Sequence, residues 1–264
     1  MDRERFDPYL LPRHPSEVDR LDLQHYAIRA ALGANHQAPV RDPDRVLDVG
    51  AGTGQWGWEI TVEFPDALVV GLDLVAGKAD PPPRYQPMRA NLLRGLPFRD
   101  ATFDFVHQRL LFLGIPTDSW PAVVADLLRV TRPGGWVELV EGPVMRFGNA
   151  GPAIERLREV ALEVVGARGL DTSATVYESL DAYLRQAGAV DVHRREVELP
   201  VGEWGGPVGS LMGTDFRAGF TRFLEFRSDL SAEEQRRLLQ RVQDEYEERH
   251  VTASLAIAHG RRPG

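Results

Sequence analysis

Three glycines at alternate positions are the residues of this chain best suited to hold a ligand against the backbone. Gly50, Gly52 and Gly54 follow the apolar run 45–49 and precede a helical pattern that begins at Gln55. Glycine has no Cβ and takes a positive φ without strain, so the backbone can approach a ligand closely at such a bend. A strand that leads through a glycine turn into a helix is typical of a cofactor bound at the helix N-terminus.

Two carboxylates narrow the choice of cofactor. Asp73 ends a second apolar run, where a nucleotide ribose would offer its hydroxyls, so the chain is expected to bind a nucleoside-containing cofactor. Gly52, Gly54 and Gly57 also match the glycine spacing of dinucleotide enzymes, which alone is a weak signal. Asp48 lies just before the first glycine, where a carboxylate would repel a pyrophosphate and attract an ammonium or a sulfonium. S-adenosylmethionine carries both of these cations, so it is favoured over NAD.

Four segments of the chain follow one another in the order of a known set of motifs: 46–56, the strand end at Asp73, 96–106 and 128–136. They resemble the motifs of class I S-adenosylmethionine-dependent methyltransferases. The segment 20–26 resembles the N-terminal segment of the LaeA-like branch, which includes natural-product methyltransferases. The resemblance extends over about residues 16 to 141 and is thin beyond them.

The resemblance implies which residues hold the cofactor. Asn91 stands where the family more often has an Asp that receives the adenine amino group, and an amide oxygen can accept the same hydrogen bond. Leu92 would flank the adenine ring, and Trp56 is close enough in sequence to face the sulfonium, although core packing is the more ordinary role. The expected cofactor-binding residues are Asp48, Gly50, Gly52, Gly54, Trp56, Asp73, Leu74, Asn91, Leu92, His107 and Gln108.

Two strand ends offer candidate catalytic groups. His107 ends the fourth strand near the transferable methyl group and would act as a general base, since its unperturbed pKa of ~6.5 is close to working pH. Glu141 closes the fifth strand at the same crevice and is the second candidate. The alternatives are that His107 bonds the backbone or packs on the cofactor, and that Glu141 is a solvated acid.

Candidate substrate residues come from three places. Arg109 would orient an anionic substrate group or form a structural ion pair. His25 and Tyr26 lie on the expected N-terminal helix, where they would either reach substrate or pack against other helices. A set of large apolar residues in the last third of the chain would line an apolar pocket or seat a helical cap on the sheet: Trp204, Met212, Phe216 and Phe220, with Phe223 and Phe226 nearby.

Composition excludes several classes of protein. The formal charge of -8 is spread without a basic stripe, so a nucleic-acid partner is not expected. The chain has no cysteine and no pair of histidines at metal-ligand spacing, so a disulfide framework and a metal site are not expected. No stretch is long and apolar enough to cross a bilayer, and residues 1–5 do not open a signal peptide. We therefore expect a cytoplasmic protein without a membrane partner.

The elements that position these residues form one domain over residues 1–264. Strands are expected over 45–49, 68–73, 85–90, 103–108, 136–141 and 190–199, with helices over 55–64, 120–131, 151–166 and 177–187. This alternation predicts an α/β fold with a doubly wound, seven-stranded, mostly parallel sheet covered on both faces. Its expected parts are an N-terminal helix over 16–33, a core over 45–200, a helical cap insertion over 204–248 and a final antiparallel strand over 250–261.

The expected function is methyl transfer from S-adenosylmethionine to oxygen, nitrogen or carbon of a small, largely apolar, natural-product-like molecule. Two alternatives share the cofactor site: a LaeA-like regulatory protein and a cyclase built on a methyltransferase fold. An NAD-dependent oxidoreductase is the third, and Asp48 argues against it. The N-terminal helix would pack on its own core or on a neighbouring copy in a homo-oligomer.

Overall fold

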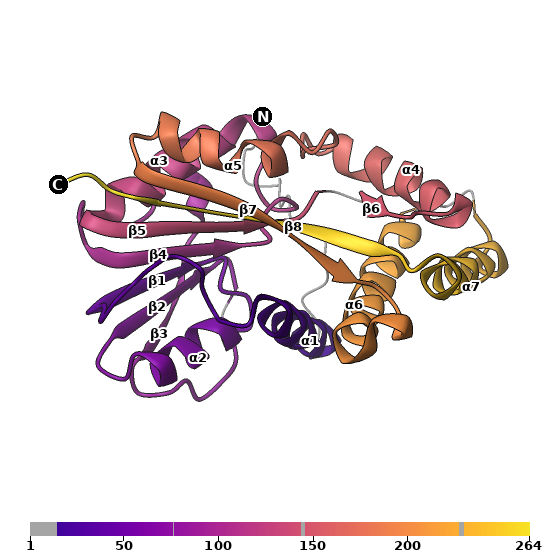
Figure 1. Ribbon diagram of the computed structural model, residues 1–264, viewed down its shortest axis with the longest axis horizontal. Helices are drawn as coiled ribbons and strands as arrows, with labels where there is room; N and C mark the ends of the chain where they lie inside the picture. Colours follow the sequence, from indigo (N-terminus) through magenta and orange to yellow (C-terminus); the bar gives the residue numbers. More distant parts are fainter. Residues whose placement is uncertain (1–14, 76, 144–145, 227–229) are drawn as a thin grey trace.

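A twisted, mostly parallel sheet forms the centre of the computed structural model, which describes residues 15–75, 77–143, 146–226 and 230–264. Within these residues the strand order is β3-β2-β1-β4-β5-β8-β6, with β7 also paired to β8 (Figure 1). The strands are β1 Arg45–Val49, β2 Leu68–Asp73, β3 Tyr85–Arg89, β4 Phe103–Arg109, β5 Thr131–Glu141, β6 Phe147–Gly148, β7 Val190–Pro200 and β8 Thr252–Arg261. The first five strands are parallel, and β8 runs antiparallel beside β5, as predicted.

Helices cover the two faces of the sheet. They are α1 Pro15–Leu32, α2 Gln55–Glu63, α3 Trp120–Val130, α4 Pro152–Gly166, α5 Thr175–Gln186, α6 Gly206–Glu225 and α7 Ala232–Arg249, with short 3₁₀ turns η1 Leu92–Arg94, η2 Thr117–Ser119 and η3 Glu203–Gly205. Side chains alternate along each strand, so Val46 of β1 packs toward α2 while Leu47 and Val49 pack toward α3 and α5. In the described part of the chain, no helix has the length and apolarity needed to span a membrane.

The sheet is not covered on both faces at the β3 edge, contrary to expectation. No helix joins β2 to β3 in the described residues 74–75 and 77–84, and only η1 lies between β3 and β4. The run Pro81-Pro82-Pro83 explains this, because proline lacks the N–H and excludes the residue before it from the helical region. Residues 86–89 of β3 are consequently exposed.

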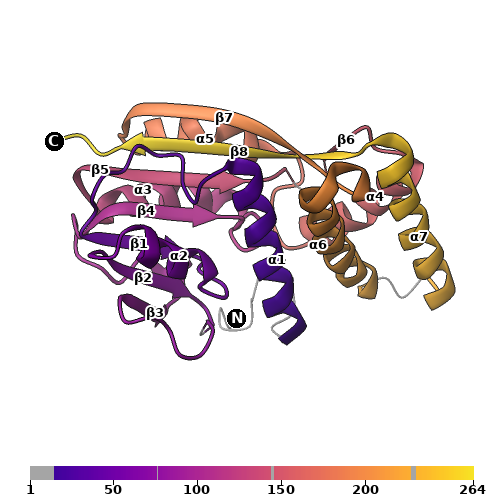
Figure 2. The same ribbon diagram turned by 60° about the horizontal axis from the view of Figure 1, so that its bottom comes forward.

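The helical cap consists of α4, α6 and α7, which lie together at one end of the molecule, with α1 between α6 and the sheet (Figure 2). Between β7 and β8, where the sequence predicts a helical cap insertion over 204–248, the chain forms η3 and the two helices α6 and α7. A capping box starts α7, because Ser231 and Glu234 each accept a hydrogen bond from the other's backbone N–H. Buried side chains of α4, α6 and α7, among them Leu157, Phe220 and Val242, form one core with side chains of α1 and of strands β5, β7 and β8.

Candidate functional site

The glycine turn after β1 has the conformation that its sequence predicts. Gly50, Gly52 and Gly54 have φ values of 74°, 55° and 85°, all in the left-handed region that glycine tolerates best. At Gly50 a larger residue is disfavoured by the packing as well as by the backbone conformation, because a Cβ would overlap the side chain of Leu111. A Cβ at Gly52 would lie 3.4 Å from Leu21 of α1. The turn therefore lies directly beneath one residue that follows β4 and one residue of α1.

Asp73 fixes the shape of this turn. Its two carboxylate oxygens accept hydrogen bonds from the backbone N–H groups of Gly52 at 2.9 Å and Val75 at 3.1 Å. Each oxygen keeps a lone pair that a ligand hydroxyl could use. Asn91, at the end of β3, accepts a bond from the Leu93 N–H at 2.9 Å through its amide oxygen, with Leu74 37% exposed at the end of β2. The expected cofactor residues of β1, β2 and β3 thus share one edge of the sheet.

His107 is placed in the interior rather than at an open crevice. It pairs in register with Asp48 across β1 and β4, and its Nδ1 lies 3.3 Å from Oδ1 of that residue. Its ring stacks on Trp56 with 3.8 Å between the centroids, while the indole N–H of Trp56 donates to the carbonyl of Asn35. Burial lowers the pKa of His107 to about 3 and raises the pKa of Asp48 to about 7. His107 is therefore neutral near pH 7, and Trp56 packs on it in the core.

Glu141 and Gln108 lie on the opposite face of the sheet from His107 and form a structural unit. Glu141 is fully buried and accepts bonds from the Gln108 amide and from the backbone N–H groups of Leu111 at 2.9 Å and Phe112 at 3.2 Å. Burial raises the pKa of Glu141 to about 8. These bonds hold the turn after β4 and so keep Leu111 over Gly50.

His25 and Arg109 form a contact between α1 and the end of β4. The Arg109 guanidinium donates to Nδ1 of His25 at 3.1 Å, and His25 is 2% exposed. Burial, and then the positive charge of Arg109, lower the pKa of His25 to about 3. Tyr26 is 42% exposed and meets His25 only through the edge of its ring. His25 is therefore buried between α1, α2 and the end of β4, where it contacts Arg109 and Glu59.

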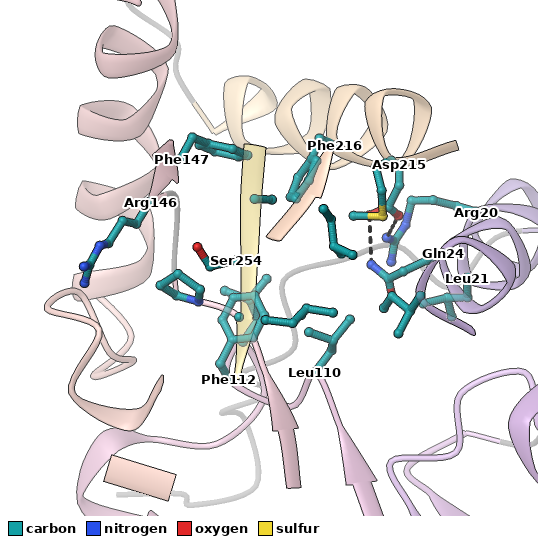
Figure 3. Close-up of a pocket in the computed structure, with 18 residues that line it drawn as sticks. Arg20, Leu21, Gln24, Leu110, Phe112, Arg146, Phe147, Asp215, Phe216 and Ser254 are labelled. Atoms are coloured by element: carbon teal, nitrogen blue, oxygen red, sulfur yellow. Dashed lines mark hydrogen bonds and ion pairs between the residues drawn. The ribbon is translucent and has the colours of Figure 1, made fainter. Parts of the chain in front are cut away.

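A cavity of about 110 Å³ opens between α1, α6 and the segments that follow β4 and β5 (Figure 3). Its enclosed part is similar in size to the roughly 150 Å³ cavity that holds benzene in an engineered protein. The lining is largely apolar, and its described members include Leu21, Ile28, Leu110, Phe112, Leu113, Phe147, Leu199, Met212, Phe216 and Leu255. Leu21 both lines the cavity and lies close to Gly52, so this side chain separates the cavity from the glycine turn.

Some of the large apolar residues proposed as pocket lining contact this cavity and others do not. Met212 and Phe216 line the cavity, whereas Phe220 is 1% exposed and lies behind Phe216, with 5.9 Å between the ring centroids. Trp204 is not among the described lining residues of this cavity. It stacks on His250 with 4.7 Å between the ring centroids, and its indole N–H donates to the Val201 carbonyl. His107, Glu141, His25, Tyr26 and Arg109 are also absent from the described lining.

The sequence analysis missed a polar group at the α1 end of the cavity. Asp215 of α6 accepts a bond from the Gln24 amide at 2.8 Å and pairs with Arg20, both on α1 (Figure 3). An acid between Met212 and Phe216 in an apolar helix face was the available signal, because such a carboxylate needs a buried partner. Arg146 points away from the cavity on the opposite side and pairs with Glu178.

A second contact holds α1 on the glycine turn. Asp22 accepts a hydrogen bond from the Thr53 hydroxyl at 2.7 Å and pairs with Lys78, which also donates to Gln55 at 2.7 Å. Among the described residues, no three His, Cys, Asp or Glu side chains lie close enough together to hold a metal ion.

Comparison with known proteins gives a consistent family. Residues 46–135 match the family model described as a methyltransferase domain. The chain is 34% identical to the N-methyltransferase tcpN of Claviceps purpurea over 204 residues, which are 72% of each chain. It is 32% identical to the methyltransferase str2 of Strobilurus tenacellus, over 74% of this chain and 71% of that one.

A solved structure shares the fold. Phosphoethanolamine N-methyltransferase 2 of Haemonchus contortus, bound to phosphomonomethylethanolamine and S-adenosylhomocysteine, aligns with a TM-score of 0.54 at 17% identity. The alignment covers 96% of this chain and 62% of that one, so this chain spans about three-fifths of its length.

Proposed function

Since this chain belongs to the class I S-adenosylmethionine-dependent methyltransferases, in their natural-product and LaeA-like branch, we propose that it methylates a nitrogen atom of a small, largely apolar molecule. The observation that carries the proposal is the apolar cavity that adjoins the glycine turn through Leu21. A ligand in this cavity would lie beside the carboxyl ends of β4 and β5, where ligands of open α/β sheets collect.

The residues of the glycine turn fit the cofactor. Oδ2 of Asp48 is buried and has no hydrogen-bond partner among the described residues, which suits the ammonium of the methionine end. Asp73 retains acceptor capacity for the ribose hydroxyls, as does Asn91 for the adenine amino group. Leu74 and Leu92 would flank the adenine ring. When bound, the cofactor supplies a methyl group that its sulfonium already activates.

The protein's contribution is alignment and exclusion of water. Methyl transfer needs the acceptor roughly 3–3.5 Å from the methyl carbon and in line with the sulfur, which favours rigid walls over acid–base groups. Phe112 and Phe216 provide such walls on two sides of the cavity. Gln24 and Asp215 would orient one polar group of an otherwise apolar substrate.

The choice of nitrogen follows from where the candidate bases lie. His107 and Glu141 lie outside the described lining, and that lining includes no histidine. An unprotonated amine attacks with its own lone pair and releases a proton to solvent after transfer, whereas a phenol or a carbon acid must first lose its proton. The relative tcpN is named an N-methyltransferase, which agrees with this choice.

The test uses three substrates built on one apolar ring: a secondary amine, a phenol and an activated methylene compound. We expect product heavier by one methylene from the amine, with formation of S-adenosylhomocysteine in equal amount. Phe216→Ala should raise KM for the amine while the affinity for S-adenosylhomocysteine stays unchanged. Methylation of the phenol alone would refute the nitrogen assignment, and failure of the protein to bind S-adenosylhomocysteine would refute the function as a whole.

A further inference from the structure

Arg109, at the end of β4, is a half-buried positive charge that forms no ion pair within the described residues. Its guanidinium carries five N–H donors, and one hydrogen bond, to Nδ1 of His25, is what the described residues provide. Burial lowers the pKa of the guanidinium below its ordinary value, which marks the cost of holding this charge away from water.

The neighbouring carboxylates are engaged elsewhere. Glu138 of β5 accepts the backbone N–H groups of Gln37 and Ala38 at 2.7 and 2.5 Å. Glu59 of α2 pairs with Arg29 at 2.9 Å. His25 is neutral near pH 7 and supplies no charge. A half-buried arginine that keeps free N–H donors and has no carboxylate partner can bind an anionic group of a ligand.

Asp48, on the neighbouring strand β1, is a negative charge with an oxygen that lacks a partner among the described residues. It shares the face of the sheet that bears His107 and Arg109. Asp48 and Arg109 influence each other's ionisation, yet they do not form an ion pair with each other. Two opposite charges held apart in one interior region match a ligand that carries both charges a short distance apart, as an α-amino acid does.

We propose that Arg109 binds the carboxylate of the methionine end of the cofactor, opposite the ammonium at Asp48. Arg109 is placed for this, because it immediately precedes the turn whose Leu111 covers Gly50. His25 is a positioning residue that holds the guanidinium through Nδ1. The inference rests on the proposed function and replaces the sequence-based expectation that Arg109 and His25 serve the substrate.

The experiment is calorimetric titration with S-adenosylhomocysteine and with its decarboxylated counterpart, which keeps the amine and lacks the carboxylate. The wild-type protein should bind S-adenosylhomocysteine roughly 30-fold more tightly, the penalty typical of leaving one member of a buried charge pair alone. Arg109→Gln should weaken S-adenosylhomocysteine by a similar factor and leave the decarboxylated ligand within about threefold, so the ratio falls toward one.

Arg29→Gln is the matched control. Arg29 lies on α1, as His25 does, but it pairs with Glu59 of α2. This variant should keep the wild-type ratio. His25→Leu should reduce the ratio, and His25→Gln, whose amide oxygen can accept the Arg109 bond, should restore much of it. Circular dichroism and thermal melts confirm that each variant is folded.

Equal weakening of both ligands in Arg109→Gln would overturn the inference and assign Arg109 to structure. An unchanged ratio in that variant would overturn it as well, and a loss of substrate binding alone would return Arg109 to the substrate. If the wild-type protein binds neither ligand, the proposed function fails first. The two failures are therefore distinguishable.

Discussion

Buried carboxylates in the cap have hydrogen-bond partners for both oxygens, whereas the buried carboxylate beside the glycine turn does not. In the cap, Asp215 is bonded through one oxygen to Arg20 and through the other to Gln24. Glu245 of α7 accepts the N–H groups of Ala153 and Ile154 at the start of α4, one with each oxygen. Beside the glycine turn, one oxygen of Asp48 is left without a partner in the residues that the structure describes.

This difference separates charges that hold the fold from charges that await a ligand. A buried polar group is expensive unless it is hydrogen-bonded, so a satisfied carboxylate stabilises the elements that it joins. A buried carboxylate without a hydrogen-bond partner lowers the stability of the ligand-free protein. A ligand that supplies the missing partner recovers this free energy on binding. Removing the carboxylate charge should therefore lower stability in the cap, whereas beside the glycine turn it should raise stability and weaken ligand binding.

The largest effect is expected for Asp215→Ala. Removing one member of a buried pair leaves Arg20 buried without its carboxylate, which should lower the free energy of unfolding by about 3 kcal/mol or more. Urea denaturation measures it. The affinity for S-adenosylhomocysteine should change less than about threefold, because this contact joins α1 to α6. A stability loss below about 1 kcal/mol would contradict the structural role.

Asp48→Asn should show the reverse pattern. Burial raises the pKa of Asp48 to about 7, so its ionised form costs stability, and at pH 8 the amide should stabilise the ligand-free protein by about 1 kcal/mol. Affinity for S-adenosylhomocysteine should fall roughly 30-fold, because the ammonium loses its counter-charge. Thermal melts and calorimetry on the same samples test both parts. A variant that is less stable and binds normally would place Asp48 with the cap residues.

The pH dependence of binding sharpens the assignment to Asp48. Because its pKa is raised to about 7, the carboxyl group is mostly neutral at pH 6 and mostly ionised at pH 8. Affinity for S-adenosylhomocysteine should therefore rise roughly tenfold from pH 6 to pH 8 in the wild-type protein. The Asp48→Asn variant should show a flat profile over this range. A slope that persists in the variant would point to another titrating group.

The smallest effect is expected at the cap surface. Arg156 and Glu159 of α4 lie 2.8 Å apart with side chains that are 53% and 62% exposed. Arg156→Gln should change the free energy of unfolding by less than about 0.5 kcal/mol, because exposed pairs gain little over solvation. The affinities for S-adenosylhomocysteine and for its decarboxylated counterpart should match those of the wild-type protein. A loss comparable with Asp215→Ala would show that burial does not govern the contrast.

Local patterns predicted the elements that carry the cofactor site. The runs 45–49 and 68–73 are strands with those bounds, and the helix after Gly54 begins at Gln55. The N-terminal helix expected over 16–33 is α1 Pro15–Leu32, which buries His25 and Ile28. Such features repeat within a few residues, so one chain shows them without reference to its partners.

Side-chain partners were less accessible to the same reasoning. His107 and Gln108 are neighbours in sequence, yet alternation sends them to opposite faces, one against Trp56 and the other against Glu141. The sheet was expected to be covered on both faces, yet residues 86–89 of β3 are exposed, and the prolines at 81–83 were the available signal. Trp204 was grouped with Met212 as apolar lining, and in the structure its ring stacks on His250, outside the described lining of the cavity.

What the sequence alone determined is the glycine turn with its flanking acids, and hence the kind of cofactor, because φ preference and charge belong to the residues themselves. Tertiary structure decided which charges find partners. Arg20 meets Asp215, and Arg109 meets a neutral His25, only because α1 packs between the sheet and α6. Burial and pairing are properties of residues brought together from distant parts of the chain, so only the folded molecule shows which charge is left for a ligand.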